Sequence, residues 1–81
     1  MHGEIKKIAR KFYAEHTIHL SIKIEHDYSD GLSTIEMYFK TGAGEKVMVT
    51  RSEDMEHFGD DHIVMAAKRM AKEMAEVASL H

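Results

Sequence analysis

Residues 17–25 read Thr-Ile-His-Leu-Ser-Ile-Lys-Ile-Glu. The four branched aliphatic residues of this stretch alternate with polar ones. A period of two is typical of a β-strand with one buried and one solvated face, and β-branched side chains suit a pleated sheet. We therefore expect a strand from Thr17 to Glu25, in a small sheet whose apolar face other elements must cover.

Two later segments, residues 34–40 and 46–51, alternate in the same way. Their inward residues would be Ile35, Met37, Phe39, Val47 and Val49. Two glycines in Thr41–Glu45 supply the backbone freedom that a hairpin turn requires. The segment 26–33 is rich in Asp, Ser and Gly and predicts a loop, with Gly31 at positive φ. Three consecutive strands with short connections predict an antiparallel meander.

Two amphipathic helices are expected to flank this sheet. Residues 4–16 and 62–80 repeat apolar residues at three- and four-residue spacing. The two apolar stripes are Ile5, Ile8, Ala9 and Phe12 in the first helix, and Ile63, Ala67, Met70, Met74 and Val77 in the second. We also expect Ser52 to cap a short helical turn, and Asp60 or Asp61 to cap the last helix.

The predicted fold class is therefore α+β, as one domain over residues 1–81. Its order is α-β-β-β-α, with a three-stranded antiparallel sheet and both helices packed on one face. The chain has no cysteine, no apolar run near the length of a membrane span and no apolar segment typical of a signal peptide. We expect a soluble cytoplasmic protein that does not contact membranes.

Charge is spread unevenly along the chain. The formal net charge is −3 with histidine neutral. Residues 1–16 carry four bases and two acids, a balance of +2, whereas residues 52–81 carry three bases and seven acids, a balance of −4. The overall sign disfavours a general polyanion binder. The bases of the first helix form a stripe opposite its apolar face, which is either a solvated face or a local basic patch.

Seven histidines raise the question of a metal site. His16 and His19 have H-x-x-H spacing, and His57 and His62 lie near a pair of aspartates. Zinc requires three or four converging ligands, so we interpret these as surface histidines and predict no metal or cofactor. The carboxylates of segment 53–61 fall in an exposed connection, where ordinary pKa values make poor general acids. The sequence predicts no catalytic residues and a protein that is not an enzyme.

The order α-β-β-β-α resembles that of double-stranded RNA-binding domains. The segment Ala66-Ala67-Lys68-Arg69-Met70-Ala71-Lys72 resembles the lysine- and alanine-rich opening of their second helix. In that family, lysines at the start of this helix grip phosphates, and the first helix and first hairpin loop contact the minor grooves. Here the helix opens with Gly59-Asp60-Asp61-His62, which would repel phosphate. The resemblance implies an alternative nucleic-acid-binding function carried by Lys6, Lys7, Arg10, Lys11, Lys68, Arg69 and Lys72.

In size, acidity, lack of cysteine and simple α/β make-up, the chain also resembles small phage-encoded inhibitors of bacterial defence, including anti-CRISPR proteins. This resemblance implies a non-enzymatic protein that occupies a basic, nucleic-acid-binding surface of a CRISPR-type complex, with acids that imitate phosphates. The acidic contact set would be Asp27, Asp30, Glu53, Asp54, Glu56, Asp60 and Asp61. A solvated helix entry is the alternative interpretation of the acidic run.

The uncovered face of the sheet is a further candidate surface. It would display His19, Ser21, Lys23, Glu25, Thr34, Glu36, Tyr38, Lys40, Met48 and Thr50. Tyr38 would anchor a protein partner, although antiparallel sheets also tolerate a solvated face. Open strand edges leave room for a homodimer. We favour the inhibitor over the RNA binder, because the acids lie where an RNA binder would need bases.

Overall fold

The computed structural model describes residues 2–54 and 59–80. Its elements follow the predicted order and number, so the α-β-β-β-α prediction is confirmed. They are α1 (His2–His16), β1 (Ser21–Asp27), β2 (Leu32–Lys40), β3 (Lys46–Asp54) and α3 (Asp60–Ala78). Among these residues, no helix combines the length and apolar character needed to cross a bilayer.

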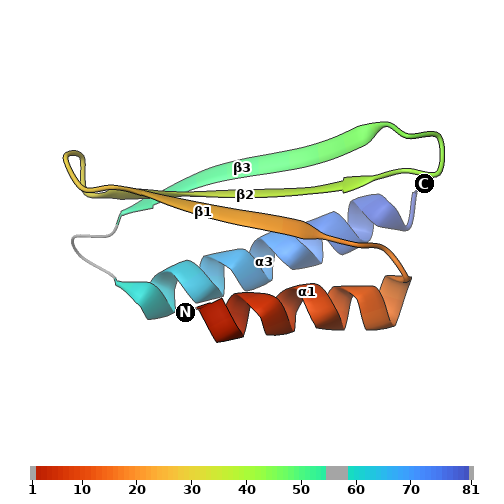
Figure 1. The fold of residues 1–81 in the computed structure, drawn as a ribbon, viewed down its shortest axis with the longest axis horizontal. Helices are drawn as coiled ribbons and strands as arrows, with labels where there is room; N and C mark the ends of the chain where they lie inside the picture. Colours follow the sequence, from red (N-terminus) through yellow and green to blue (C-terminus); the bar gives the residue numbers. More distant parts are fainter. Residues whose placement is uncertain (1, 55–58, 81) are drawn as a thin grey trace.

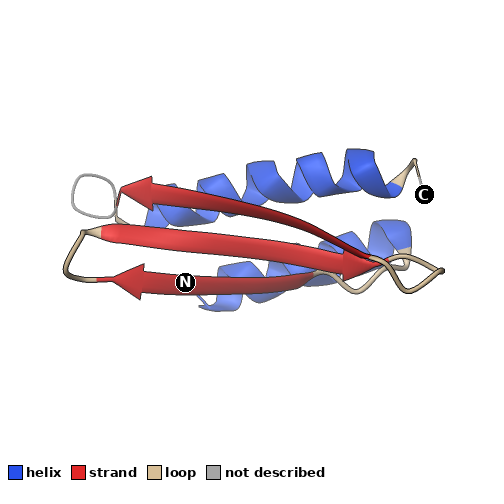
Figure 2. Cartoon of the chain, turned by 90° about the horizontal axis from the view of Figure 1, so that it is seen from above, coloured by secondary structure: helices blue, strands red, loops and turns tan. Residues whose placement is uncertain are grey.

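The molecule has two layers, a sheet and a pair of helices (Figure 1). The sheet is an antiparallel meander in the order β1-β2-β3, so that β2 is the central strand. Both helices lie on the same face of the sheet, side by side and running in the same direction (Figures 1 and 2). No helix of the described residues lies on the opposite face of the sheet, as predicted.

The core forms where β2 meets the helices. Ile35, Met37 and Phe39 are buried on the inward face of β2, as the alternation predicted. From the helix side, α1 contributes Ile8 and Phe12. The buried residues of α3 are Ile63, Val64, Ala66, Ala67, Met70, Met74 and Ala78. Its small alanines let the helix backbone approach the sheet closely, and the longer methionines fill the remaining space.

The first strand begins later than predicted. The structure places Thr17 at φ 57°, and its N–H donates to the Tyr13 carbonyl at 2.7 Å. This left-handed residue ends the helix and turns the chain, so strand pairing starts at Ser21 rather than at Thr17. His19 consequently lies outside the sheet, where its ring stacks on Tyr13 at 4.6 Å between centroids. The prediction of His19 on the outward sheet face was wrong.

The third strand is longer than predicted. Residues 52–54, where we expected a helical turn to start, belong to this strand, and residues 55–58 of that expected turn lie outside the described residues. Ser52 and Glu53 pair with Thr34 and Ser33 of β2, and the strand continues to Asp54. Ser52 is a strand residue, and its hydroxyl lies 3.3 Å from that of Thr34 across the sheet. Cross-strand pairing has overridden the local turn and cap signals of this polar segment.

The start of the last helix also differs from the prediction. Gly59 occupies the N-cap position, at φ 77° and ψ −167°, and no side chain makes a capping hydrogen bond there. Asp60 and Asp61 lie within the first turn instead of capping it. They still complement the positive end of the helix dipole. The helix ends at Ala78, two residues earlier than the 62–80 pattern predicted.

Candidate binding surfaces

Acidic residues from three separate parts of the chain lie at one end of the molecule (Figure 1). Asp27 ends β1 and lies opposite Leu32 of β2, which in turn lies opposite Asp54 of β3. The β1–β2 loop carries Asp30, and α3 starts at the same end with Asp60 and Asp61 (Figure 1). We call Asp27, Asp30, Asp54, Asp60 and Asp61 the acidic end. The antiparallel register brings Asp27, Asp54 and the β1–β2 loop to this end, because strands that end or begin together bring their loops together.

The loop acid Asp27 is held by local hydrogen bonds. The hydroxyl of Ser29 donates to its Oδ1 at 2.6 Å, and the Ser29 N–H donates to the same atom at 3.0 Å. These two hydrogen bonds hold the pKa of the Asp27 carboxyl below its ordinary value, and the bond from the hydroxyl has the larger effect. Asp27 therefore stays ionised, in a defined position, at every physiological pH.

The other acids of the predicted contact set are placed differently. Glu53 points toward the helix layer, where its Oε2 lies 3.0 Å from Nε2 of His62. Both side chains are partly buried, so Glu53 joins β3 to α3 rather than facing a partner. Glu56 lies outside the described residues.

Tyr38 is separated from the acidic end. It lies on the uncovered face of the sheet, in one cross-strand row with Ser21 and Met48. The Lys46 ammonium lies 4.2 Å from the centre of its ring, a cation–π contact. The structure thus splits the predicted set into an acidic end and a tyrosine on a different, cationic part of the surface.

On β1, the uncovered sheet face carries charges that pair with one another. Lys23 of β1 forms a 2.9 Å salt bridge with Glu25 and lies opposite Glu36 of β2. The hydrogen bond and the charge of Glu25 raise the pKa of Lys23. These neighbours satisfy one another, which is typical of a solvated antiparallel face.

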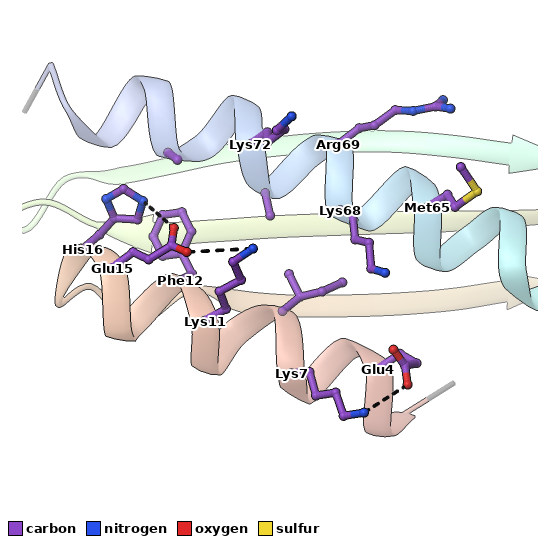
Figure 3. A pocket seen from close by; sticks show the side chains of 13 residues that line it. Glu4, Lys7, Lys11, Phe12, Glu15, His16, Met65, Lys68, Arg69 and Lys72 are labelled. Atoms are coloured by element: carbon purple, nitrogen blue, oxygen red, sulfur yellow. Dashed lines mark hydrogen bonds and ion pairs between the residues drawn. The ribbon is translucent and has the colours of Figure 1, made fainter.

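A groove runs between the two helices on the side of the molecule away from the sheet. Its volume is about 610 Å³. Its floor is apolar, and its rims carry five cationic side chains that come from both helices: Lys7 and Lys11 of α1, and Lys68, Arg69 and Lys72 of α3. Figure 3 shows Lys11 and Lys68 extending from opposite helices into the space between them. We call this feature the basic groove.

The cations of the two rims differ in their pairing. Lys7 and Lys11 form exposed salt bridges along α1, with Glu4 at 3.4 Å and Glu15 at 3.9 Å. Those of α3, namely Lys68, Arg69 and Lys72, form no salt bridge with any other described residue. The α3 rim is therefore the part of the groove with uncompensated positive charge.

Five of the seven predicted nucleic-acid-binding residues thus line one groove, and two do not. Lys6 lies elsewhere on the surface of α1. Arg10 lines a smaller hollow with Tyr13, His19 and Leu20 on the other flank of α1. The sequence showed a cationic face on each helix, but only the packing of α1 beside α3 reveals that the two faces share a groove.

The described histidines do not belong to a metal-binding group. Within residues 2–54 and 59–80, no group of three or more His, Cys, Asp or Glu side chains could hold a metal ion. His16 packs its ring on Phe12 at 4.7 Å between centroids, and His26 Nδ1 lies 2.6 Å from the buried Ser33 hydroxyl. These two histidines thus make structural contacts.

Comparison of the chain with protein-family models, with curated proteins and with solved structures gives no match in any of the three.

Proposed function

We propose that this protein is a non-enzymatic interaction module, and that its acidic end occupies a basic, nucleic-acid-binding surface of a bacterial defence complex of the CRISPR type. The observation that carries this proposal is that acids of the β1–β2 loop, the end of β3 and the start of α3 lie at the same end of the molecule (Figure 1). No lysine or arginine among the described residues forms a salt bridge with Asp27, Asp30, Asp60 or Asp61.

Carboxylates grouped in this way can stand in for phosphates. A basic surface that attracts nucleic acid attracts such an end for the same electrostatic reason, and complementary charge speeds association. Asp60 and Asp61 are both exposed. They occupy the first turn of α3, where the helix dipole stabilises their charged forms. Asp27, Asp30, Asp60 and Asp61 therefore offer negative charges that no described lysine or arginine neutralises in a salt bridge.

Nucleic-acid binding is the alternative, and the basic groove is the observation that favours it. The resemblance to double-stranded RNA-binding domains, however, requires bases in the first hairpin loop and at the start of the last helix. Both segments lie at the same end of this molecule, and they carry Asp27, Asp30, Asp60 and Asp61. Phosphates approaching that end would be repelled, which is why the inhibitor is the better-supported function.

A competition assay tests the proposal directly. Purified CRISPR effector complexes would be mixed with a fluorescent target DNA duplex, and DNA binding would be followed by anisotropy as this protein is added. We expect the wild-type protein to lower DNA binding by at least one such complex, and Asp60→Lys with Asp61→Lys to abolish that effect. The matched control is Glu45→Lys with Glu76→Lys, which makes the same charge change outside the acidic end and should still inhibit.

Direct titration with RNA and DNA duplexes completes the test. Salt-sensitive binding of duplexes by the wild-type protein, strengthened by the Asp60→Lys and Asp61→Lys changes, would overturn the proposal in favour of nucleic-acid binding. Equal inhibition by the charge-reversed protein and by its control would show that the acidic end is not the contact surface.

A further inference from the structure

The basic groove is a second surface with the features of a docking site, and the acidic end does not use it. We propose that it binds an amphipathic α-helix of a partner protein, with apolar residues on one face and acidic residues beside them. The two rims, the apolar floor and the dimensions of the groove support this occupant independently. The proposal goes beyond the function of the acidic end and does not depend on it.

The floor requires apolar groups in the occupant. It is formed by Ile8 and Phe12 of α1 and by Ala71 and Ala75 of α3. Met65 stands at the groove with 54% of its surface exposed, although it is a large apolar residue. A flexible methionine beside small alanines suits adaptable packing against aliphatic side chains. Burying such groups is favourable only if the ligand brings apolar surface of its own.

The rims require negative charge in the occupant. The lining contains five cationic side chains and two carboxylates, Glu4 and Glu15. Its formal net charge is therefore +3 with His16 neutral. Because the cations of α3 have no acidic partner among the described residues, an acidic ligand can pair with them without breaking an existing salt bridge. Charge complementarity of this kind selects the partner and raises the association rate.

The length of the groove matches a short helix. Its lining runs from Met65 to Ala75 along α3 and from Glu4 to His16 along α1. At about 1.5 Å per residue, these stretches are about 15–18 Å long. A third helix of about three turns would fill the space and complete a three-helix layer, the mode in which an amphipathic helix docks into a groove.

A nucleic-acid strand fits this groove less well than a helix. Proteins that bind single strands present exposed aromatic rings on which bases stack. The aromatic rings that line this groove are Phe12, which is only 4% exposed, and His16, which packs on Phe12. The floor therefore offers aliphatic contacts rather than surfaces on which bases can stack. A charged phosphate backbone has no apolar groups to pack against these aliphatic side chains.

Binding of a designed peptide tests the proposal. The probe is a fluorescent peptide of about 14 residues built from Leu, Ala and Glu. Its leucines are spaced three and four residues apart, so that they form one helical face flanked by glutamates. We expect saturable binding by the wild-type protein at micromolar concentration. Lys11→Glu with Lys68→Glu should weaken it about tenfold or more, because both side chains extend into the groove. The same peptide with lysine in place of glutamate should not bind.

Two controls separate this result from general charge effects. Lys6→Glu with Lys40→Glu makes the same charge change away from the groove and should leave peptide binding unchanged. Met65→Ala should weaken binding without unfolding the protein, because this side chain is exposed. Circular dichroism would confirm that every variant is folded.

Four results would overturn the proposal. The first is absence of peptide binding by the wild-type protein, and the second is equal weakening by the groove variant and its control. The third is saturable binding of single-stranded RNA that the groove variant loses while peptide binding persists, which would assign the groove to nucleic acid. The fourth is self-association of the wild-type protein, measured by sedimentation, that the groove variant abolishes. This result would make a second copy of the chain the occupant of the groove.

Discussion

The Oε2 atom of Glu53, near the end of β3, and the Nε2 atom of His62, in the first turn of α3, lie 3.0 Å apart. The side chains are only 20% and 29% exposed. This contact joins the sheet layer to the helix layer next to the segment that connects them. It fixes where α3 begins under the sheet, and so positions Asp60 and Asp61.

Removing the carboxylate should therefore destabilise the fold. We expect Glu53→Ala to lower the free energy of unfolding by about 1 kcal/mol, since His62 loses a partly buried partner. Glu73→Ala provides a matched control, because the Arg51–Glu73 salt bridge is more exposed and should contribute about 0–0.5 kcal/mol. Urea denaturation of both variants measures the difference, and equal effects would contradict the role assigned to the Glu53–His62 contact.

Truncation of two methionines of α3 should change the stability of the protein by very different amounts. Met74 is fully buried among the core residues, whereas Met65 is 54% exposed. We expect Met74→Ala to lower the free energy of unfolding by about 2–4 kcal/mol through the cavity that it leaves. Met65→Ala should change it by less than about 0.5 kcal/mol. Thermal and urea unfolding measure both, and a comparable loss for Met65→Ala would show that its side chain is not free for a partner.

Gly59 should not tolerate a side chain. It sits at the N-cap of α3 at φ 77°, a conformation in which L-residues are strained even though the space around it is open. We expect Gly59→Ala to destabilise the protein by about 1–2 kcal/mol. Gly3→Ala within α1 should instead stabilise it by a few tenths of a kcal/mol, roughly the gain in helix propensity near a helix end. If both substitutions had the same sign in urea denaturation, the strain at Gly59 would be disproved.

The hydrogen bonds at Asp27 predict a pH dependence of stability at acid pH. Because the Ser29 hydroxyl and N–H lower the pKa of this carboxyl in the folded state, its ionised form stabilises the fold above the ordinary pKa of 3.8. This contribution should disappear as the pH falls through the lower folded value. Asp27→Asn should therefore destabilise the protein at neutral pH but have a smaller effect near about pH 2. Urea denaturation at the two pH values tests this, and a difference that stays constant would argue against the Ser29 contacts.

Much of the fold could be predicted because hydrophobic periodicity is a local signal. Alternation placed Ile35, Met37 and Phe39 inward, and all three are buried. Spacing of three and four residues likewise identified Met70 and Met74 as core residues. The boundaries could not be predicted as well. Thr17 alternates with the strand residues in sequence, but its left-handed conformation belongs to the end of α1.

The candidate surfaces depend on contacts between distant parts of the chain, which periodicity does not report. From the sequence, Glu53 was predicted to be an exposed acid in a polar connection. Pairing of β3 with β2 instead turns its side chain toward His62. The basic groove arises only because Lys11 and Lys68 are brought to facing rims of two packed helices. Two residues of its apolar floor, Ile8 and Phe12, were predicted only as part of the core-facing stripe of the first helix.

The packing of α1 against α3 also has a consequence for the order of folding. It joins the beginning of the chain to its end, whereas the two hairpins of the sheet join neighbouring segments. Hairpins form within about 1–10 μs, because they close short loops. The meander can therefore assemble early, but it then exposes Ile35 and Phe39 to water until both helices dock. We expect helix docking to complete folding, and the interval before it to be the period in which the nascent chain is most prone to aggregate.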